Sequence, residues 1–173
     1  MADSDRETWS RLIFDKLVDA GVSLFSYVPD FGNAAIVEMA EENNRTRAVL
    51  LASEQEGVAL CAGADLVGER GVLLMQSSGV GNCPNMLSLI AGGRFPMLMI
   101  VTMRGDYGEQ NPWQYPMGQA VVPVLEAMGM LTIMVEREDE LEQAVDAALS
   151  GAFKAGQGVA LVLTQKFLGA KSF

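Results

Sequence analysis

The chain has 173 residues, half of them apolar, and carries a formal net charge of −10 at neutral pH. This acidic balance argues against binding to nucleic acid and to anionic membrane surfaces, and no apolar run approaches the length of a membrane span. The sequence contains two cysteines and no histidine. We therefore expect no disulfide scaffold, no histidine-based metal cluster and no Ser-His or Cys-His catalytic pair within the chain.

Apolar runs alternate with helical segments along the whole chain. The predicted strands are Val22–Val28, Ala48–Ala52, Gly71–Gln76, Pro96–Thr102, Leu131–Val135 and Val159–Leu163. The predicted helices are Ser4–Ala20, Asn33–Asn43, Glu54–Val67, Pro84–Ala91, Gln119–Met128 and Glu138–Ala155. Several strands are continuously apolar, as in strands covered on both faces. Because a helix joins each pair of strands, right-handed crossovers predict a single α/β domain over residues 1–173, with a doubly wound, six-stranded parallel sheet and helices on both faces.

Four polar segments follow the ends of the first four predicted strands, where open parallel sheets bind ligands. They are Pro29–Asn33, Ser53-Glu54, Gln76–Asn82 and the segment that begins at Arg104. The loop Arg104–Met117 is long for a connection in a compact domain, and such loops are often functional. Because the carboxyl ends of parallel strands share one edge of a sheet, we expect the four segments to lie together.

Each polar segment also has a purely structural interpretation. Ser53 and Glu56 have the spacing of a capping box at the start of a helix, which explains Glu56 almost completely and Glu54 only in part. A turn at Asp30 with Asn33 as a helix cap is equally ordinary. Arg104 can simply pair with a nearby acid such as Asp106 at the surface.

Seven short motifs stand in a fixed order along nearly the whole chain. They are Gly21-Val22, Val28-Pro29-Asp30, Glu54-x-x-Gly57, Gly63, Gln76-Ser77-Ser78-Gly79-Val80-Gly81-Asn82, Pro96-Met97-Leu98 and Arg104-Gly105. In this order they resemble the pyrimidine-binding (Pyr) domain of thiamine-diphosphate-dependent decarboxylases. Within these enzymes, the motifs resemble most specifically the sulfopyruvate and phosphonopyruvate decarboxylase family, including its separate alpha subunits.

The resemblance implies thiamine diphosphate as cofactor and assigns roles to residues of this chain. Glu54 stands where the family has the catalytic glutamate, which hydrogen-bonds N1′ of the aminopyrimidine and favours its imino tautomer. The residues implied to bind the cofactor with it are Ser78, Gly79, Val80 and Asn82. Asp30 and Arg104 fall on the substrate side, where a guanidinium fork suits a sulfonate or phosphonate. Met103 departs from the His or Trp that family members often carry there.

The sequence lacks the Gly-Asp-Gly motif with which thiamine diphosphate enzymes hold the diphosphate through Mg²⁺. The resemblance therefore implies that a separate beta (PP-domain) subunit supplies the metal and diphosphate ligands, and that this chain supplies none for the metal. It also implies self-association through Pyr domains and a small anionic 2-oxo acid as substrate. The chain begins without the basic and apolar regions of a signal peptide, so we expect a cytoplasmic protein.

Three alternatives remain open from the sequence. The reaction can be that of another thiamine-dependent decarboxylase or of a carboligase like acetolactate synthase. The chain can instead be a non-catalytic, Pyr-like regulatory subunit. A nucleotide-binding doubly wound domain is the third, although Ser78-Gly79-Val80-Gly81 is an incomplete glycine fingerprint.

Overall fold

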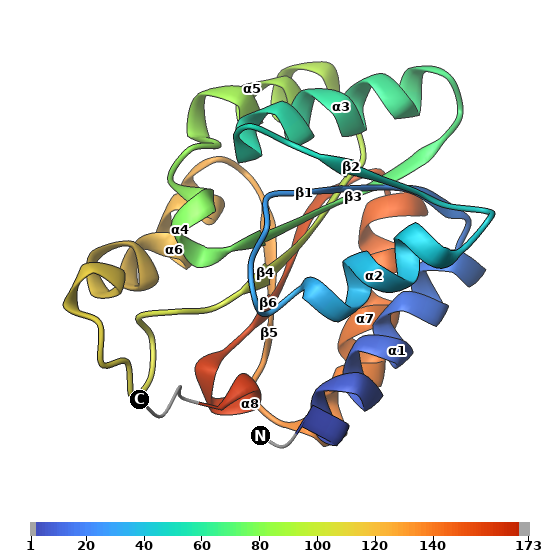
Figure 1. Ribbon diagram of the computed structural model, residues 1–173. Helices are drawn as coiled ribbons and strands as arrows, with labels where there is room; N and C mark the ends of the chain where they lie inside the picture. The colour runs from blue at the N-terminus through green and yellow to red at the C-terminus, as the bar shows by residue number, and fades with distance from the viewer. Residues whose placement is uncertain (1–2, 170–173) are drawn as a thin grey trace.

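The computed structural model describes residues 3–169, with side chains from Thr8 onward (Figure 1). Its strands are β1 (Val22–Tyr27), β2 (Arg47–Leu50), β3 (Arg70–Gln76), β4 (Met97–Thr102), β5 (Leu131–Val135) and β6 (Gly158–Leu163). Its longer helices are α1 (Asp3–Asp19), α2 (Ala34–Glu42), α3 (Glu54–Leu66), α5 (Pro84–Gly93), α6 (Tyr115–Ala127) and α7 (Glu138–Phe153). The described order also includes the short α4 (Ser77–Val80), η1 (Pro112–Gln114) and α8 (Gln165–Leu168). No helix within residues 3–169 is long and apolar enough to cross a bilayer.

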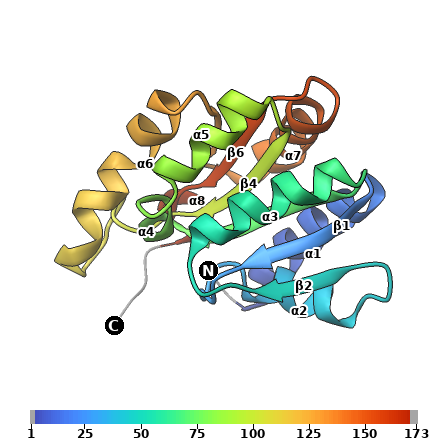
Figure 2. The same ribbon diagram turned by 90° about the horizontal axis from the view of Figure 1, so that it is seen from above.

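The six strands are parallel and lie in the order β2-β1-β3-β4-β6-β5. After β1 the chain adds β2 on one side, then crosses over to add β3 on the other. The direction of winding therefore reverses between β1 and β3, and helices cover both faces of the sheet (Figure 2). This arrangement confirms the predicted doubly wound fold and places a topological switch point between β1 and β3, where such sheets bind ligands.

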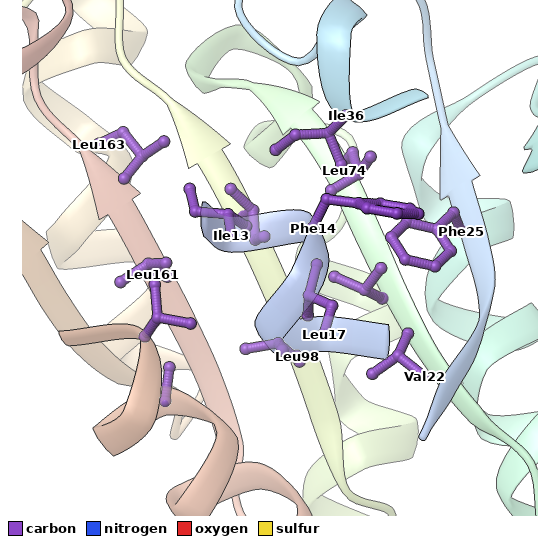
Figure 3. Close-up of a cluster of buried hydrophobic side chains, with 14 of the residues drawn as sticks. Ile13, Phe14, Leu17, Val22, Phe25, Ile36, Leu74, Leu98, Leu161 and Leu163 are labelled. Carbon is purple, nitrogen blue, oxygen red and sulfur yellow. The ribbon is translucent and has the colours of Figure 1, made fainter. Parts of the chain in front are cut away.

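Successive side chains of the central strands enter two different hydrophobic clusters. Leu74 and Leu98 pack on the face that α1, α2 and α7 cover (Figure 3). Leu73 and Met99 pack on the opposite face, under α3, α5 and α6. Because both faces are buried, β3, β4 and β6 read in the sequence as continuous apolar runs rather than alternating ones.

The long loop after β4 is shorter than predicted. α6 begins at Tyr115, not at Gln119, and η1 occupies the residues just before it. Pro116 is tolerated because it lies in the first turn of α6, where its missing N–H is not needed. Gly118 lies so close to the backbone of Arg104 and Gly105 that any side chain would overlap it. The predicted turn after β3 also contains one helical turn, α4.

Two predicted helix caps are wrong in their details. Ser53 occupies the N-cap position of α3, but its side chain makes no capping hydrogen bond. Glu56 Oε2 does accept a backbone N–H, that of Ala52 at 2.9 Å rather than that of Ser53. Asn33 is the N-cap residue of α2, yet its side chain does not cap the helix. Its Nδ2 group donates to the carboxylate of Asp30 at 2.8 Å, whereas its Oδ1 atom, which would accept the N–H in a cap, has no hydrogen-bond partner within the described side chains.

Candidate active site

The four polar segments lie at the carboxyl edge of the sheet, as predicted, and hydrogen bonds join three of them directly. Asn82, which follows α4, donates from Nδ2 to Oε2 of Glu54 at 2.7 Å. The hydroxyl of Ser77, the first residue of α4, donates to the carbonyl of Arg104 and accepts its N–H, both at 3.0 Å. The segment after β3 is therefore tied both to the segment after β2 and to the loop after β4.

Glu54 is the first residue of α3 and is only 8% exposed. Among the side chains described, from Thr8 onward, its Oε1 atom has no hydrogen-bond partner, and no Lys or Arg forms an ion pair with the carboxyl group. Gly79 lies directly against Oε1, where a Cβ atom would overlap it. A mostly buried carboxyl group with one unpartnered oxygen can accept a hydrogen bond from a ligand bound at this edge.

The predicted cofactor-binding residues of α4 differ in the groups that they make available to a ligand. Ser78 is exposed, and its hydroxyl donates to Gln76 Oε1 at 3.1 Å. Gly79 is buried beside Glu54. Val80 is fully buried in the cluster beneath α3 and α5. Val80 thus offers a ligand at this edge only its backbone, whereas Ser78 offers a side chain.

Asp30, predicted on the substrate side, makes a closed set of hydrogen bonds. Its Oδ1 accepts the N–H groups of Gly32 at 2.6 Å and Asn33 at 3.1 Å, and the hydroxyl of Thr102 at 3.1 Å. Its Oδ2 accepts from Asn33 Nδ2, which also donates to the carbonyl of Met75 at 3.2 Å. Asp30 therefore fastens the loop after β1 to the ends of β3 and β4.

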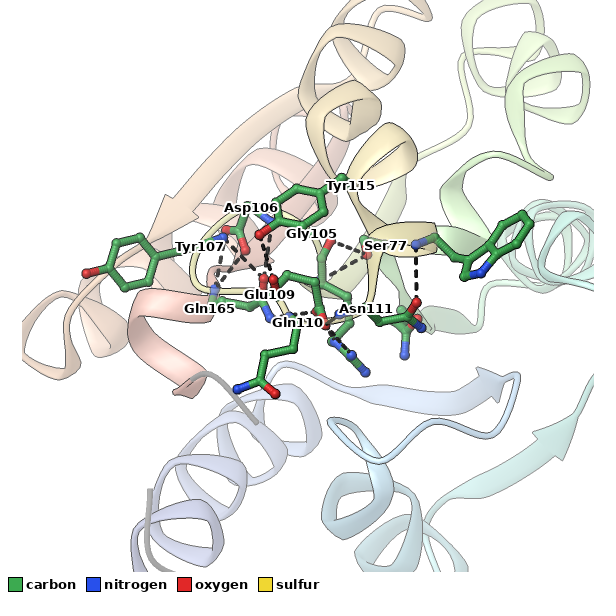
Figure 4. A network of polar contacts seen from close by, with 12 residues as sticks. Ser77, Gly105, Asp106, Tyr107, Glu109, Gln110, Asn111, Tyr115 and Gln165 are labelled. Carbon is green, nitrogen blue, oxygen red and sulfur yellow. Dashed lines mark hydrogen bonds and ion pairs between the residues drawn. The ribbon is translucent and has the colours of Figure 1, made fainter. Parts of the chain in front are cut away.

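Arg104, the other predicted substrate residue, forms a bidentate ion pair with Glu109, which is labelled within the network of polar contacts in Figure 4. Nε donates to Oε2 and Nη2 donates to Oε1 at 2.6 Å, and the two side chains are 14% and 1% exposed. Glu109 also accepts from Gln165 Nε2 at 2.9 Å and from the N–H groups of Gln110 and Asn111. The Arg104 hydrogen bonds lower the pKa of Glu109 to about 2, despite its burial.

Sequence reasoning missed Glu109 and Gln165. The only local signal for Glu109 is an acid five residues after Arg104. Gln165 follows β6 and is brought to the site by the fold, not by any motif. The alternative pairing of Arg104 with Asp106 is wrong, because Asp106 accepts the backbone N–H of Gln165 at 3.3 Å instead.

The base of the loop after β4 is fixed, while part of it faces solvent. The Tyr115 hydroxyl donates to the carbonyl of Glu109 at 2.6 Å. Gly105 has φ +82°, and the Gln114 carbonyl lies against the place where its side chain would be. Trp113 is 87% exposed. Closure of this loop over the site stays a prediction.

Neither thiol is suited to nucleophilic chemistry. Burial, with a smaller contribution from Glu54, raises the pKa of Cys83 to about 12. Burial likewise raises the pKa of Cys61 to about 11. Both thiols are therefore neutral at physiological pH. Within residues 3–169, no three Cys, Asp or Glu side chains gather as a possible metal site.

Comparison with known proteins connects this geometry to a family. A family profile described as "Thiamine pyrophosphate enzyme, N-terminal TPP binding domain" matches residues 7–120. A protein of Methanocaldococcus jannaschii named sulfopyruvate decarboxylase subunit alpha is 31% identical over 154 residues, 88% of this chain and 91% of the relative. A phosphonopyruvate decarboxylase of Streptomyces viridochromogenes is 32% identical over 134 residues, 76% of this chain and 34% of that longer protein.

A solved structure supports the fold. A 2-oxoglutarate:ferredoxin oxidoreductase from Magnetococcus marinus superposes with a TM-score of 0.66 at 16% identity. The superposition covers 90% of this chain and 28% of the other, so this chain corresponds to about a quarter of that protein. At this level of identity the likeness shows a shared architecture.

A doubly wound parallel sheet with a buried carboxyl group and a glycine-containing turn at its carboxyl edge defines an α/β protein of the ligand-binding class. Within that class, the chain belongs to the family of thiamine pyrophosphate (thiamine diphosphate) enzymes, as an N-terminal TPP-binding domain. The resemblance carried by the seven sequence motifs is confirmed.

Proposed function

We propose that this chain is the alpha subunit of a thiamine-diphosphate-dependent decarboxylase that acts on sulfopyruvate or phosphonopyruvate. The observation that carries the proposal is Glu54, a mostly buried carboxyl group with one unpartnered oxygen at the carboxyl edge of the sheet. The names of the relatives, sulfopyruvate decarboxylase subunit alpha and phosphonopyruvate decarboxylase, support the reaction and the substrate class.

The residues at this edge fit the pyrimidine end of the cofactor. Oε1 of Glu54 is an available acceptor, and Gly79 has no side chain to displace it. We propose that Glu54 shares a proton with N1′ of the aminopyrimidine, that Ser78, Gly79 and Val80 line the pocket around it, and that Asn82 takes part in cofactor binding through its hydrogen bond with Glu54. When bound, thiamine diphosphate supplies the thiazolium ring that accepts electrons as carbon dioxide leaves a 2-oxo acid.

Arg104 and Asp30 are the proposed substrate residues, and they act in different ways. A guanidinium group has five N–H donors, and Glu109 engages two of them. The remaining donors suit the oxygens of a sulfonate or phosphonate. Both oxygens of Asp30 are already engaged, so its proposed contribution is to hold the loop after β1 at the pocket.

We propose that a separate beta (PP-domain) subunit binds Mg²⁺ and the diphosphate, with the cofactor bridging the two chains. The absence of a Gly-Asp-Gly motif here supports this division, as do the relatives named as alpha subunits. Residues 1–173 then form a single Pyr domain that also associates with a second copy of itself. The two cysteines, Cys61 and Cys83, form no disulfide, which agrees with the proposed cytoplasmic location.

The test is to co-purify the chain with a candidate beta subunit that carries the Gly-Asp-Gly motif and to measure carbon dioxide release. The substrates are sulfopyruvate, phosphonopyruvate and pyruvate, and the products are identified. We expect release from the first or second substrate by the complex and none by the isolated chain. Acetolactate as product would point to a carboligase, and inactivity on every 2-oxo acid to a regulatory subunit; either result rejects the proposal.

A pair of matched variants tests the role of Glu54. In the complex, we expect Glu54→Gln to abolish nearly all activity without changing the fold, because an amide cannot share a proton in this way. Glu56→Gln, two residues further along the helix and exposed, keeps an oxygen that accepts from Ala52. It should leave activity intact. Activity of Glu54→Gln close to that of Glu56→Gln would reject the role.

A further inference from the structure

We infer that Asn82 is a positioning residue whose side-chain amide fixes the orientation of the Glu54 carboxyl group. The inference rests on the proposed function of Glu54 and adds a residue that acts through it. The distance from Asn82 Nδ2 to Glu54 Oε2 is 2.7 Å. Within residues 8–169, whose side chains the structure describes, this is the only hydrogen bond made by the Glu54 carboxyl group.

The backbone of Asn82 is itself held at the end of α4. Its N–H donates to the carbonyl of Gly79 at 3.0 Å, and the N–H of Cys83 donates to the carbonyl of Val80 at 3.1 Å. The Cys83 thiol also lies 3.5 Å from the Gly79 carbonyl. The amide therefore reaches Glu54 from a fixed turn, which is what a positioning residue requires.

Gly79 completes the arrangement on the other side of the carboxyl group. A side chain at this position would overlap Oε1. The terminal torsion of a glutamate is broad and roughly two-fold, so a free carboxyl group would occupy many orientations. With Oε2 bound to Asn82 and Oε1 against bare backbone, Glu54 has one defined orientation.

The chemistry of the donor matters as much as its position. A Lys or Arg partner would hold the carboxyl group in its ionised form, since an opposite charge favours that form. The amide of Asn82 is neutral and does not ionise near neutral pH. It orients Glu54 without placing a positive charge beside the carboxyl group.

The first test is Asn82→Ala in the complex with the Gly-Asp-Gly partner. We expect kcat to fall about 10- to 100-fold, as when the outer partner of a functional group is removed. The half-saturating concentration of thiamine diphosphate should stay near the wild-type value. An unchanged kcat would overturn the inference. So would a raised half-saturating concentration with kcat restored at saturating cofactor, because Asn82 would then bind the cofactor directly.

The second test detects the contact between Asn82 and Glu54 without measuring catalysis. In ¹³C-carboxyl spectra of the full chain, the Glu54 signal is identified by its absence from Glu54→Gln. Asn82→Asp places a second carboxyl group beside the first, so the Glu54 titration midpoint should rise by about 1 pH unit or more. The nearby Cys83 thiol, with a pKa raised to about 12, stays neutral throughout.

Asn44→Asp is the charge-matched control for this titration. Asn44 is exposed in the turn before β2, at the amino edge of the sheet and away from Glu54. This variant should leave the Glu54 midpoint unchanged. Equal midpoints in Asn82→Asp and Asn44→Asp would overturn the inference, and this comparison stands even where Asn82→Ala does not fold.

The two tests separate this inference from the proposed function. If the Glu54 titration midpoint shifts in Asn82→Asp but the complex is inactive on every 2-oxo acid, the proposed decarboxylase function is rejected. The contact between Asn82 and Glu54 is then retained. An active complex in which Asn82→Ala has full kcat keeps the decarboxylase and rejects the positioning role. Neither result depends on the other.

Discussion

The ion pair between Arg104 and Glu109 predicts a large, pH-dependent effect of Glu109→Gln on stability. The pKa of Glu109 falls from 4.5 to about 2 in the folded protein, chiefly through its hydrogen bonds with Arg104. At 1.36 kcal/mol per pKa unit this corresponds to about 3 kcal/mol of stability at neutral pH. The same magnitude follows independently, because removing one partner of a buried ion pair costs about 3–5 kcal/mol.

The sign of the pH dependence follows from the direction of the shift. A carboxyl group whose folded pKa is lowered contributes its full stability above the unfolded pKa of about 4.5. That contribution falls as the pH drops toward about 2, and roughly half of it is lost by pH 3. Wild type and Glu109→Gln should therefore differ most at pH 7 and converge in acid.

Urea and thermal unfolding of the full chain measure this difference. At pH 7 we expect the Tm of Glu109→Gln to fall by roughly 6–12 °C, since 1 kcal/mol moves the Tm of a chain this size by about 2–4 °C. Asp139→Asn is the matched control, because Asp139 pairs with Arg137 on the exposed surface, and it should leave the unfolding curve unchanged. If both variants unfold alike, or if the Glu109→Gln difference persists undiminished at pH 3, the reasoning is wrong.

Three further predictions follow from burial and close packing. Gly79→Ala should lower the kcat of the complex about 100-fold, because its Cβ displaces the carboxyl group of Glu54; wild-type kcat would contradict this. Leu74→Ala, in a fully buried position of β3, should lower the free energy of unfolding by about 2–5 kcal/mol in urea, and a loss well below that range would show that the core collapses around the change. Cys61 and Cys83 should resist iodoacetamide at pH 8 in the folded chain and react in urea, since burial raises the pKa of both thiols; equal rates would contradict the burial.

The sheet could be predicted from the sequence because its central strands are buried on both faces. The continuous apolar runs placed β3, β4 and β6 to within one residue. The start of α6 could not be predicted, because Pro116 and Gly118 are poor helix formers by propensity. There the close approach of Gly118 to the Arg104 and Gly105 backbone decides the structure, and only the fold brings those segments together.

The same contrast applies to the candidate site. The position of Glu54 at a strand-to-helix turn is a local property, so the sequence predicted it. Its contact with Asn82 joins segments that follow different strands, and the capping pattern at Ser53 gave no indication of it. The pairing of Arg104 with Glu109 and Gln165 likewise depends on where β4 and β6 end.

The hydrogen bonds of three carboxyl groups at this edge show why Glu54 is the one left to act on a ligand. Asp30 accepts from the loop after β1 and from Thr102 with both oxygens. Glu109 accepts hydrogen bonds from the guanidinium group of Arg104, from the side-chain amide of Gln165 and from two backbone N–H groups. Its lowered pKa keeps it ionised. Glu54 accepts from a single neutral amide and faces no cation within the described chain. Two acids therefore hold the edge of the sheet in shape, and the third retains an unpartnered oxygen with which to bind a ligand.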